Sequence, residues 1–329
     1  MPKLCVIPGD GIGQEVIPAA VTILQAALPN LETVEAEAGW GCFEKHGVSV
    51  LPETLDQIRA CGAGLFGAVS SPLRKVDGYK SAILTLRQEL NLYANIRPVQ
   101  SWPRVSPRPD VNLIVVRENS EGLYVGRERS DGETAVAQRI ITKQASARIG
   151  QKTAELVRQL GRQKVTIVHK ANVLPLTDGL FRDTVRQEIE LLSPATEIDE
   201  LLVDVAALKM VAAPETFDVI VTTNLFGDIL SDAAAHWGGG LGLAASLNWG
   251  DGLAIAEPVH GSAPDIAGQG IANPLAAVLS TALLARFAWG LEEVANRLET
   301  AVHQTLTAKN YLQLTTTRAI QEAVLVNLR

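Results

Sequence analysis

The run Asn224-Leu-Phe-Gly-Asp-Ile-Leu-Ser-Asp232 follows the apolar run Phe217-Asp-Val-Ile-Val-Thr-Thr223. The apolar residues are typical of a buried strand. Gly227 is expected to end this strand, and the residues after it are expected to open a helix. Asp228 and Asp232 would then lie on one face of that helix. The C-terminal end of a strand is also where open α/β sheets bind their ligands.

The two aspartates favour a positive partner, because like charges four residues apart weaken a helix by a few tenths of a kcal/mol. Magnesium and manganese ions take carboxylate oxygens and keep room for substrate and water. The pair is also typical of a solvated acidic face, which requires no ligand. The strand-end position favours the metal site, as does a third carboxylate, Asp204, in the apolar run of residues 201–208.

Length and composition limit the class of protein. The 329 residues suggest two domains, and the hydrophobic share of 47% is enough for a large core. The formal net charge of −7 argues against a nucleic-acid-binding surface. The three cysteines, Cys5, Cys42 and Cys61, show no disulfide pattern and indicate a reducing, cytoplasmic compartment.

Neither a signal peptide nor a membrane-spanning helix is expected. The apolar start at residues 4–7 is too short for the core of a signal peptide. Residues 266–285 carry no Asp, Glu, Lys or Arg, but their opening glycines and Pro274 leave too short an apolar remainder to cross a bilayer. That remainder, residues 275–285, predicts a buried helix.

The N-terminus reads as a strand over residues 3–7, a glycine-rich turn and a helix over residues 14–28. The turn contains Gly9, Gly11 and Gly13, with Val16 where a dinucleotide fingerprint would have its third glycine. A Rossmann domain is therefore not supported. The glycines indicate either a tight turn with unusual backbone angles or contact with a cofactor.

Helix and strand patterns then alternate along the chain, which predicts an α/β protein with a largely parallel sheet. The polar residues 122–139 predict an arm or hairpin. Helices are expected over residues 52–60, 81–90 and 143–160, and strands over residues 63–69, 111–116 and 164–168, with a strand or turn at 93–97.

Several charged residues sit at the ends of these elements. Arg87, Arg97 and Arg117 are suited to bidentate binding of carboxylates, although each is also typical of an ordinary surface residue. Lys170, at a strand end, is either a desolvated general base or a lysine that reaches into solvent. The neighbouring His169 is interpreted as a structural histidine.

Six motifs together resemble the β-decarboxylating dehydrogenases, a family that includes isocitrate, 3-isopropylmalate and homoisocitrate dehydrogenases. They are GDGIGxE, LRxELxLYANIRP, RENSEGLY, HKANVL, NLFGDILSD and EPVHGSAPDIAGxGIANP. The resemblance covers about residues 3–300. It implies a two-domain α/β fold with mixed sheet and flanking helices, not a Rossmann fold. It divides the chain into residues 1–92 plus 238–329 and residues 93–237, with the active-site cleft between them, and implies a homodimer.

The resemblance also implies roles for individual residues. Arg87, Arg97 and Arg117 would hold the carboxylates of a malate-like substrate, and Tyr124 would protonate the enol after carbon dioxide leaves. Lys170 of the partner chain would take the proton of the substrate hydroxyl. Magnesium or manganese would be bound by Asp228, Asp232 and Asp204 of the partner chain. Ser71, Ser81 and Asn172 complete the implied substrate site.

The stretch from Glu257 to Asn273 resembles the family's adenosine-binding loop. A carboxylate at Asp265 would accept hydrogen bonds from the adenine ribose and repel the 2′-phosphate of NADP, which predicts NAD as the cofactor. Asn273 would contact the adenine. The implied cofactor-binding residues are Asn172, Glu257, His260, Gly261, Ser262, Ala263, Asp265, Ile266 and Asn273.

The substrate prediction rests on the pattern KVxGYxSxIxxLRxE at residues 75–89, which most resembles homoisocitrate dehydrogenases. Ser81 stands where isocitrate and homoisocitrate enzymes have a serine, whereas Leu84 would suit the isopropyl group of 3-isopropylmalate. The prediction is oxidation of homoisocitrate to 2-oxoadipate, a step of lysine biosynthesis by the aminoadipate route. Isocitrate and 3-isopropylmalate are the alternatives.

Two other classes remain as rivals at this point. A non-catalytic, regulatory relative should have lost some of the metal or arginine ligands, and all of them are present in the sequence. A metal-independent binding protein for dicarboxylates would need neither Lys170 nor Tyr124. It would also leave Asp204, Asp228 and Asp232 unexplained.

Overall fold

A computed structural model describes residues 1–72, 74 and 76–329 of the chain. Lys75, with which the homoisocitrate-like pattern begins, and Leu73 lie outside the described residues. The chain forms two compact units. Unit 1 comprises Met1–Leu92, Trp102–Pro109 and Gly238–Arg329, and unit 2 comprises Tyr93–Ser101 and Asp110–Trp237.

Unit 1 is built on strands in the order β2-β1-β3-β12-β11. The pairs are parallel except β11 with β12, which are antiparallel neighbours in sequence. The strands are β1 (Lys3–Gly9), β2 (Glu32–Glu35), β3 (Ala63–Ala68), β11 (Ala245–Trp249) and β12 (Ala254–Pro258). The helices are α1 (Gly13–Ala27), α2 (Trp40–His46), α3 (Pro52–Cys61), α4 (Ala82–Glu89), α9 (Leu275–Leu283), α10 (Glu292–Thr307) and α11 (Thr317–Leu328).

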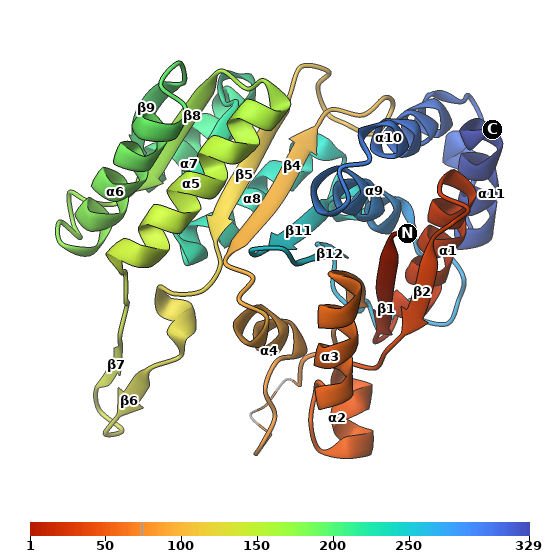
Figure 1. Ribbon diagram of the computed structural model, residues 1–329, viewed down its shortest axis with the longest axis horizontal. Coiled ribbons are helices and arrows are strands. Elements are labelled where there is room, and N and C mark those ends of the chain that lie inside the picture. Colours follow the sequence, from red (N-terminus) through yellow and green to blue (C-terminus); the bar gives the residue numbers. More distant parts are fainter. Residues whose placement is uncertain (73, 75) are drawn as a thin grey trace. The chain divides into compact units, whose positions relative to one another are not determined.

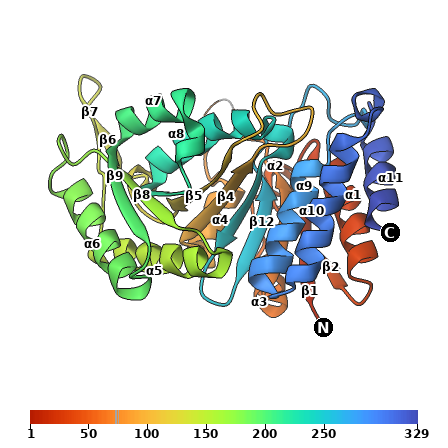
Figure 2. The ribbon, with the colours of Figure 1, turned by 90° about the horizontal axis from the view of Figure 1, so that it is seen from above.

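Helix α9 is the central helix of this unit. All nine of its residues are buried, as the charge-free sequence predicts. It contacts α1 and α10, and Figure 2 shows these helices with α11 grouped together. Gly9 and Gly11 adopt positive φ angles of 73° and 54°, which confirms the tight turn predicted after the first strand.

Unit 2 has strands in the order β4-β5-β10-β8-β9, of which only β4 and β5 are antiparallel. The strands are β4 (Ala94–Gln100), β5 (Asn112–Glu118), β8 (Lys164–His169), β9 (Glu197–Leu202) and β10 (Val219–Thr222). Helices α5 (Lys143–Leu160) and α6 (Thr177–Leu192) cover one face, and α7 (Val203–Ala212) and α8 (Asn224–Ala235) cover the other (Figures 1 and 2).

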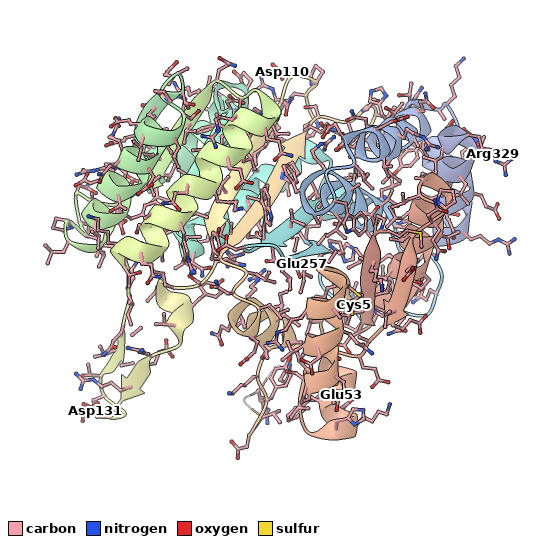
Figure 3. The ribbon with its side chains drawn as sticks, viewed as in Figure 1. Cys5, Glu53, Asp110, Asp131, Glu257 and Arg329 are labelled. Atoms are coloured by element: carbon pink, nitrogen blue, oxygen red, sulfur yellow. The ribbon has the colours of Figure 1, made fainter. Side chains whose placement is uncertain are left out.

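The predicted arm of unit 2 is a hairpin of two short strands, β6 (Glu128–Ser130) and β7 (Ala135–Ala137). Every residue of the two strands is exposed. Asp131 lies at its tip (Figure 3), where its side chain accepts hydrogen bonds from the backbone of Glu133 and Thr134.

The structure confirms the α/β class and the mixed sheet, and corrects two expectations. Gly227 was expected to end the strand, but α8 begins at Asn224 and Gly227 lies inside the helix. Trp102–Pro109 groups with unit 1 rather than with the rest of residues 93–237. Trp102 packs against His303 at 6.4 Å between ring centres, and Arg104 donates to the carbonyl of Thr307 at 3.0 Å.

Within the described residues, no helix combines the length and the apolar character that crossing a membrane requires.

Two glycines, Gly67 in unit 1 and Gly179 in unit 2, allow the packing inside each unit to be tested. A Cβ atom at Gly67 of β3 would lie 2.0 Å from the carbonyl oxygen of Pro8 on β1, and backbone cannot move aside cheaply. We expect Gly67→Ala to destabilise the protein by roughly 1–3 kcal/mol or more. Gly179→Ala in α6 meets no atom within 4 Å. It should be neutral or stabilising by up to about 1 kcal/mol, because alanine favours a helix.

Melting temperatures of the two variants and the unsubstituted protein provide the measurement. A Gly67→Ala protein as stable as Gly179→Ala would contradict the close approach of β1 and β3.

Candidate active site

The candidate site of unit 2 lies where β4, β5 and α8 meet. Arg97 on β4 and Arg117 on β5 are buried, with 7% and 1% of their surface exposed. The β4–β5 register places Asn95 directly opposite Arg117, and Asn95 and Arg97 share one face of their strand because they are two residues apart. The antiparallel pair thus brings both arginines to one part of the unit.

Both arginines bind the aspartates of α8. Asp228 Oδ1 accepts hydrogen bonds from Arg117 Nη1 and, at 3.4 Å, from Arg97 Nη2. Asp232 Oδ1 accepts from Arg97 Nη1 at 3.0 Å. The aspartates therefore share a helix face, as predicted, and in this structure the positive charges beside them are guanidinium groups.

Gly227 makes this contact between α8 and β5 possible. A Cβ atom at this position would lie 2.6 Å from Arg117 Cγ and 2.7 Å from Arg117 Cβ. The side chain of Arg117 thus occupies the space that any other residue at position 227 would fill. The glycine is needed so that α8 can pack closely against β5, and not to end the strand.

Tyr124 joins the same cluster. Its hydroxyl donates to Asp228 Oδ2, and the guanidinium carbon of Arg117 lies 5.0 Å from the centre of its ring. Burial and the hydrogen bond to Asp228 raise the pKa of Tyr124 above its ordinary value, although the nearby charge of Arg117 acts in the opposite direction. The phenol is consequently protonated at neutral pH.

Lys170 and Asp204 form a separate pair in unit 2. Lys170 Nζ donates to Asp204 Oδ1, and the hydrogen bond from Lys170 lowers the pKa of Asp204. Both side chains reach solvent, so the lysine is not the fully desolvated group that one reading of the sequence expected. The backbone nitrogen of Lys170 donates at 2.6 Å to Asp178, a buried carboxylate that also binds Arg139.

His169 has the structural character expected from the sequence. Its Nδ1 accepts a hydrogen bond from the backbone of Ala171 at 3.1 Å, and its Nε2 lies 3.6 Å from Glu200 Oε2. Burial lowers its pKa, so the ring is neutral near pH 7.

In unit 1, Arg87 on α4 is held by the β11–β12 hairpin. Its Nε donates to Asn248 Oδ1 and its Nη2 to Glu257 Oε1, both at 3.0 Å. Asn248 Nδ2 donates to the same Glu257 oxygen at 2.8 Å. Glu257, labelled in Figure 3, was predicted as a cofactor-binding residue, and the structure pairs it with an arginine predicted to bind substrate.

The other predicted cofactor residues of unit 1 gather around one loop. The backbone of Ile12 donates to the carbonyl of Ser262 at 2.9 Å, so the glycine turn contacts this loop. His260 Nδ1 lies 3.0 Å from the carbonyl of Gly261, and burial lowers its pKa. Ala263 has a φ of 39°. Asp265, which carries the predicted carboxylate, is exposed. Ile266 follows in the same turn, where its backbone nitrogen donates to Ala263.

Asn273 lies at the start of α9. Its Oδ1 accepts a hydrogen bond from the backbone of Leu275 at 3.0 Å, and its Nδ2 donates to the Tyr311 hydroxyl at 3.3 Å. These two bonds hold the chain in place just before the buried helix begins.

The remaining predicted substrate residues are Ser71, Ser81 and Asn172. Ser71 and Asn172 are exposed. Ser81 precedes α4, and its hydroxyl makes no capping hydrogen bond to the described backbone of that helix. Tyr79, from the homoisocitrate-like pattern, packs against Trp40 and Phe43 with ring centres 5.2 Å away in each case.

A divalent cation fits the donor chemistry of α8. The side chains of Asp228 and Asp232 are 33% and 57% exposed, so their carboxylate oxygens are accessible to an ion. Oxygen donors of this kind suit magnesium or manganese. Among the described residues of this single chain, however, no three His, Cys, Asp or Glu side chains come together as a metal site.

Three asparagines beside the predicted arginines were not predicted from the sequence. Asn95, Asn224 and Asn248 each accept a hydrogen bond from one of the three arginines through the amide oxygen. The spacing of two between Asn95 and Arg97 is a signal that was available, because it places both on one face of a strand. Asn224 and Asn248 are far in sequence from Arg117 and Arg87, so no local pattern indicates their contacts.

Comparison with known proteins finds similarity to dehydrogenases of one family. The family model described as isocitrate/isopropylmalate dehydrogenase matches residues 3–323. The isocitrate/homoisocitrate dehydrogenase of Thermus thermophilus is 53% identical over 300 residues, which cover 91% of this chain and 89% of that protein. The 3-isopropylmalate dehydrogenase of Methanothermobacter thermautotrophicus is 47% identical, with 92% and 90% covered. The crystal structure of isocitrate dehydrogenase from Methylococcus capsulatus matches with a TM-score of 0.93 and 41% identity, covering all of both chains.

The raised pKa of Tyr124 can be measured directly. The ultraviolet titration curve of the Tyr124→Phe variant is subtracted from that of the unsubstituted protein. The difference isolates this phenol from the other three tyrosines. We expect phenolate to appear only above the ordinary tyrosine value of about 10. Asp228→Asn should lower the pKa of Tyr124, because it removes the carboxylate that raises this pKa and leaves Arg117, which lowers it. Asp232→Asn, which alters a carboxylate bound to Arg97, is the control and should have the smaller effect. Ionisation at or below pH 10 would contradict the geometry.

Proposed function

The chain belongs to the isocitrate/isopropylmalate dehydrogenase family, and we propose that it catalyses metal-dependent oxidative decarboxylation of a 3-substituted malate with NAD. Homoisocitrate is the proposed substrate, and 2-oxoadipate the product. The observation that carries the proposal is the cluster of unit 2, in which two buried arginines and Tyr124 converge on one carboxylate of α8.

The arginines supply the substrate-binding groups. In this structure the Nη groups of Arg97 and Arg117 already bind carboxylate oxygens, those of Asp228 and Asp232. They are therefore suited to the carboxylates of a malate core. Arg87 on α4 is the third proposed carboxylate ligand.

A bound magnesium or manganese ion would polarise the C2 oxygen of the substrate, and NAD would accept the hydride that leaves C2. The residues of the chain handle the protons. Lys170 takes the proton of the C2 hydroxyl. The bond between C3 and its carboxyl group then breaks, and carbon dioxide leaves. The two electrons of that bond remain on the substrate, which becomes an enolate.

Tyr124 returns a proton to C3 of this enolate. Its raised pKa keeps the phenol protonated at neutral pH, which a proton donor requires. The hydroxyl is held by Asp228 Oδ2, so the proton has a defined position next to the arginines.

A homodimer is proposed, in which Lys170 and Asp204 complete the site of the partner chain. Within one chain these two residues bind each other. Asp204 lies on α7 beside a patch of exposed apolar side chains. The patch consists of Val205, Leu208 and Val211 on α7 and Ile229 on α8. Leu208 and Val211 are 70% and 67% exposed, and such a patch typically marks a protein–protein interface.

The β6–β7 hairpin supports the same proposal. An isolated two-stranded hairpin is only marginally stable in water, and every residue of both strands is exposed in the single chain. Pairing with a second copy would provide the missing neighbours.

NAD is proposed over NADP because of Asp265. Its carboxylate is exposed on the loop that resembles the family's adenosine site. A carboxylate accepts hydrogen bonds from the ribose hydroxyls and repels a 2′-phosphate.

The substrate is proposed from the start of α4. Ser81, Leu84 and Arg87 follow one another at intervals of three residues and therefore share one side of the helix. Ser81 offers a donor to the additional carboxylate of homoisocitrate or isocitrate, whereas Leu84 offers an apolar surface. Similar proteins include isocitrate/homoisocitrate, homoisocitrate and 3-isopropylmalate dehydrogenases, so each of the three acids has a precedent.

A kinetic comparison tests the proposed function. NADH formation is measured with homoisocitrate, isocitrate and 3-isopropylmalate, with NAD or NADP, and with magnesium or a chelator. We expect the highest kcat/KM with homoisocitrate and NAD, and loss of activity in chelator.

The matched variant is Ser81→Ala, which removes the hydroxyl and no more. It should reduce kcat/KM roughly tenfold for homoisocitrate and isocitrate, because a hydrogen bond to a charged group is lost, and leave 3-isopropylmalate unchanged. A preference for 3-isopropylmalate in the unsubstituted enzyme would show that Leu84, not Ser81, selects the substrate.

Mixed dimers test the contribution of the partner chain. Asp228→Asn and Lys170→Met homodimers are each expected to be nearly inactive while they retain their melting temperature. When the two variants are co-expressed with different tags and purified on both, one site per dimer combines an intact Asp228 with an intact Lys170 of the partner subunit. Activity should return at one of the two sites. Mixed dimers that stay as inactive as the parents would place Lys170 in the site of its own chain.

A further inference from the structure

Each of the three arginines donates its Nε–H to an asparagine. Arg97 Nε donates to Asn95 Oδ1 at 2.7 Å and Arg117 Nε to Asn224 Oδ1 at 3.0 Å, both within unit 2. In unit 1, Arg87 Nε donates to Asn248 Oδ1 at 3.0 Å. The three asparagines are 0%, 1% and 0% exposed in that order. The three pairs come from different elements, so the pattern does not follow from a shared local motif.

The Nε contact decides which edge of a guanidinium faces the protein. The group has five N–H donors in a fixed planar fork, and a carboxylate binds in bidentate fashion either at the Nε–Nη side or at the Nη–Nη end. Asn224 Oδ1 also accepts from Arg117 Nη2 at 2.7 Å, so it covers the whole side edge. In Arg117 the side edge is thereby closed to carboxylates, and Asp228 binds at Nη1. In Arg87 and Arg97 the asparagine accepts the Nε–H alone.

The orientation of the amide is itself fixed. Asn224 Nδ2 donates to the carbonyl of Glu121 at 3.1 Å, and Asn248 Nδ2 donates to Glu257 Oε1 and to the carbonyl of Ile255. These acceptors require the NH₂ group of each amide, so its oxygen points toward the arginine.

The choice of asparagine rather than aspartate has an electrostatic consequence. An amide oxygen satisfies a buried N–H without adding charge, whereas a carboxylate would cancel the positive charge of the guanidinium. A neutral acceptor therefore adds no further negative charge beside arginines that already face Glu257, Asp228 or Asp232.

We propose that Asn95, Asn224 and Asn248 are positioning residues for substrate binding, which hold the side edge of each arginine and preserve its charge for a substrate carboxylate. This inference rests on the proposed role of the arginines in binding a 3-substituted malate. It assigns to the asparagines no contact with substrate, and it explains why a neutral side chain accepts the Nε–H of all three arginines.

The test replaces each amide of unit 2 by a carboxylate of the same shape. Asn224→Asp and Asn95→Asp keep an acceptor for the Nε–H but cancel charge beside Arg117 or Arg97. Asn95→Asp should keep the melting temperature of the unsubstituted chain, whereas Asn224→Asp should lower it, because a carboxylate oxygen then faces the carbonyl of Glu121. KM for the 3-substituted malate should rise at least about tenfold, and kcat should change less.

The control is Asn296→Asp in unit 1. Asn296 Oδ1 also accepts a hydrogen bond from a buried arginine, Arg286, at 2.8 Å, but that arginine is bound to Glu292 and Glu299. The same substitution beside a structural arginine should leave KM unchanged. Asn224→Leu is the second comparison, because it removes the acceptor without adding charge and should lower the melting temperature as well as raise KM.

Calorimetric titration with malate, at saturating magnesium, gives a readout that does not need turnover. The unsubstituted protein should bind malate, and Asn224→Asp and Asn95→Asp should each weaken binding at least about tenfold. If malate binds but no 3-substituted malate is oxidised, the proposed function fails while the asparagine variants still decide this inference. Malate affinity and KM that are unchanged in both aspartate variants would overturn it. Absence of malate binding to the unsubstituted protein would overturn both.

Discussion

The buried charge of Arg117 is the constraint on which the candidate site of unit 2 depends. A guanidinium that is 1% exposed must be paired and hydrogen-bonded, because an uncompensated buried charge costs several kcal/mol. Asp228 provides the negative charge and Asn224 the neutral acceptor, and both lie on α8. The helix can approach closely enough only because Gly227 has no side chain. One charge therefore fixes the position of α8 against β5, and with it the position of Tyr124.

The sequence predicted the elements well where hydrophobic periodicity is strong. The helix expected over residues 143–160 coincides with α5, and the charge-free residues after Pro274 form the fully buried α9. The prediction for Gly227 was wrong because a glycine after an apolar run usually ends an element. Its actual reason, the space needed by Arg117, is a contact between residues far apart in sequence, which no local pattern contains.

The candidate site was predicted in its residue types but not in its pairing. Like charges at Asp228 and Asp232 correctly indicated a need for positive charge, yet that argument does not distinguish a metal ion from a guanidinium. The structure supplies two guanidinium groups, from Arg97 and Arg117. The asparagines beside the arginines were missed for a related reason. Buried amides have no charge and no periodic signature, so only Asn95, two residues from its arginine, left a trace in the sequence.

Charge balance connects the arginines with the proposed metal. At neutral pH the two aspartates of α8 carry two negative charges, and Arg97 and Arg117 carry two positive ones, so the cluster is neutral as it stands. A divalent cation alone would leave it with two excess positive charges, and the two carboxylates of a malate core alone would leave two excess negative ones. The cation and the two carboxylates of the malate core together preserve neutrality in this cluster, where an unbalanced charge is costly. The additional carboxylate of homoisocitrate is assigned to Ser81 in the proposed site and stands outside this count. On the proposed function, the same charge argument favours binding of metal and substrate as a pair. It also requires that the residues holding the arginines add no charge of their own, a condition that aspartate in place of Asn95 or Asn224 would break.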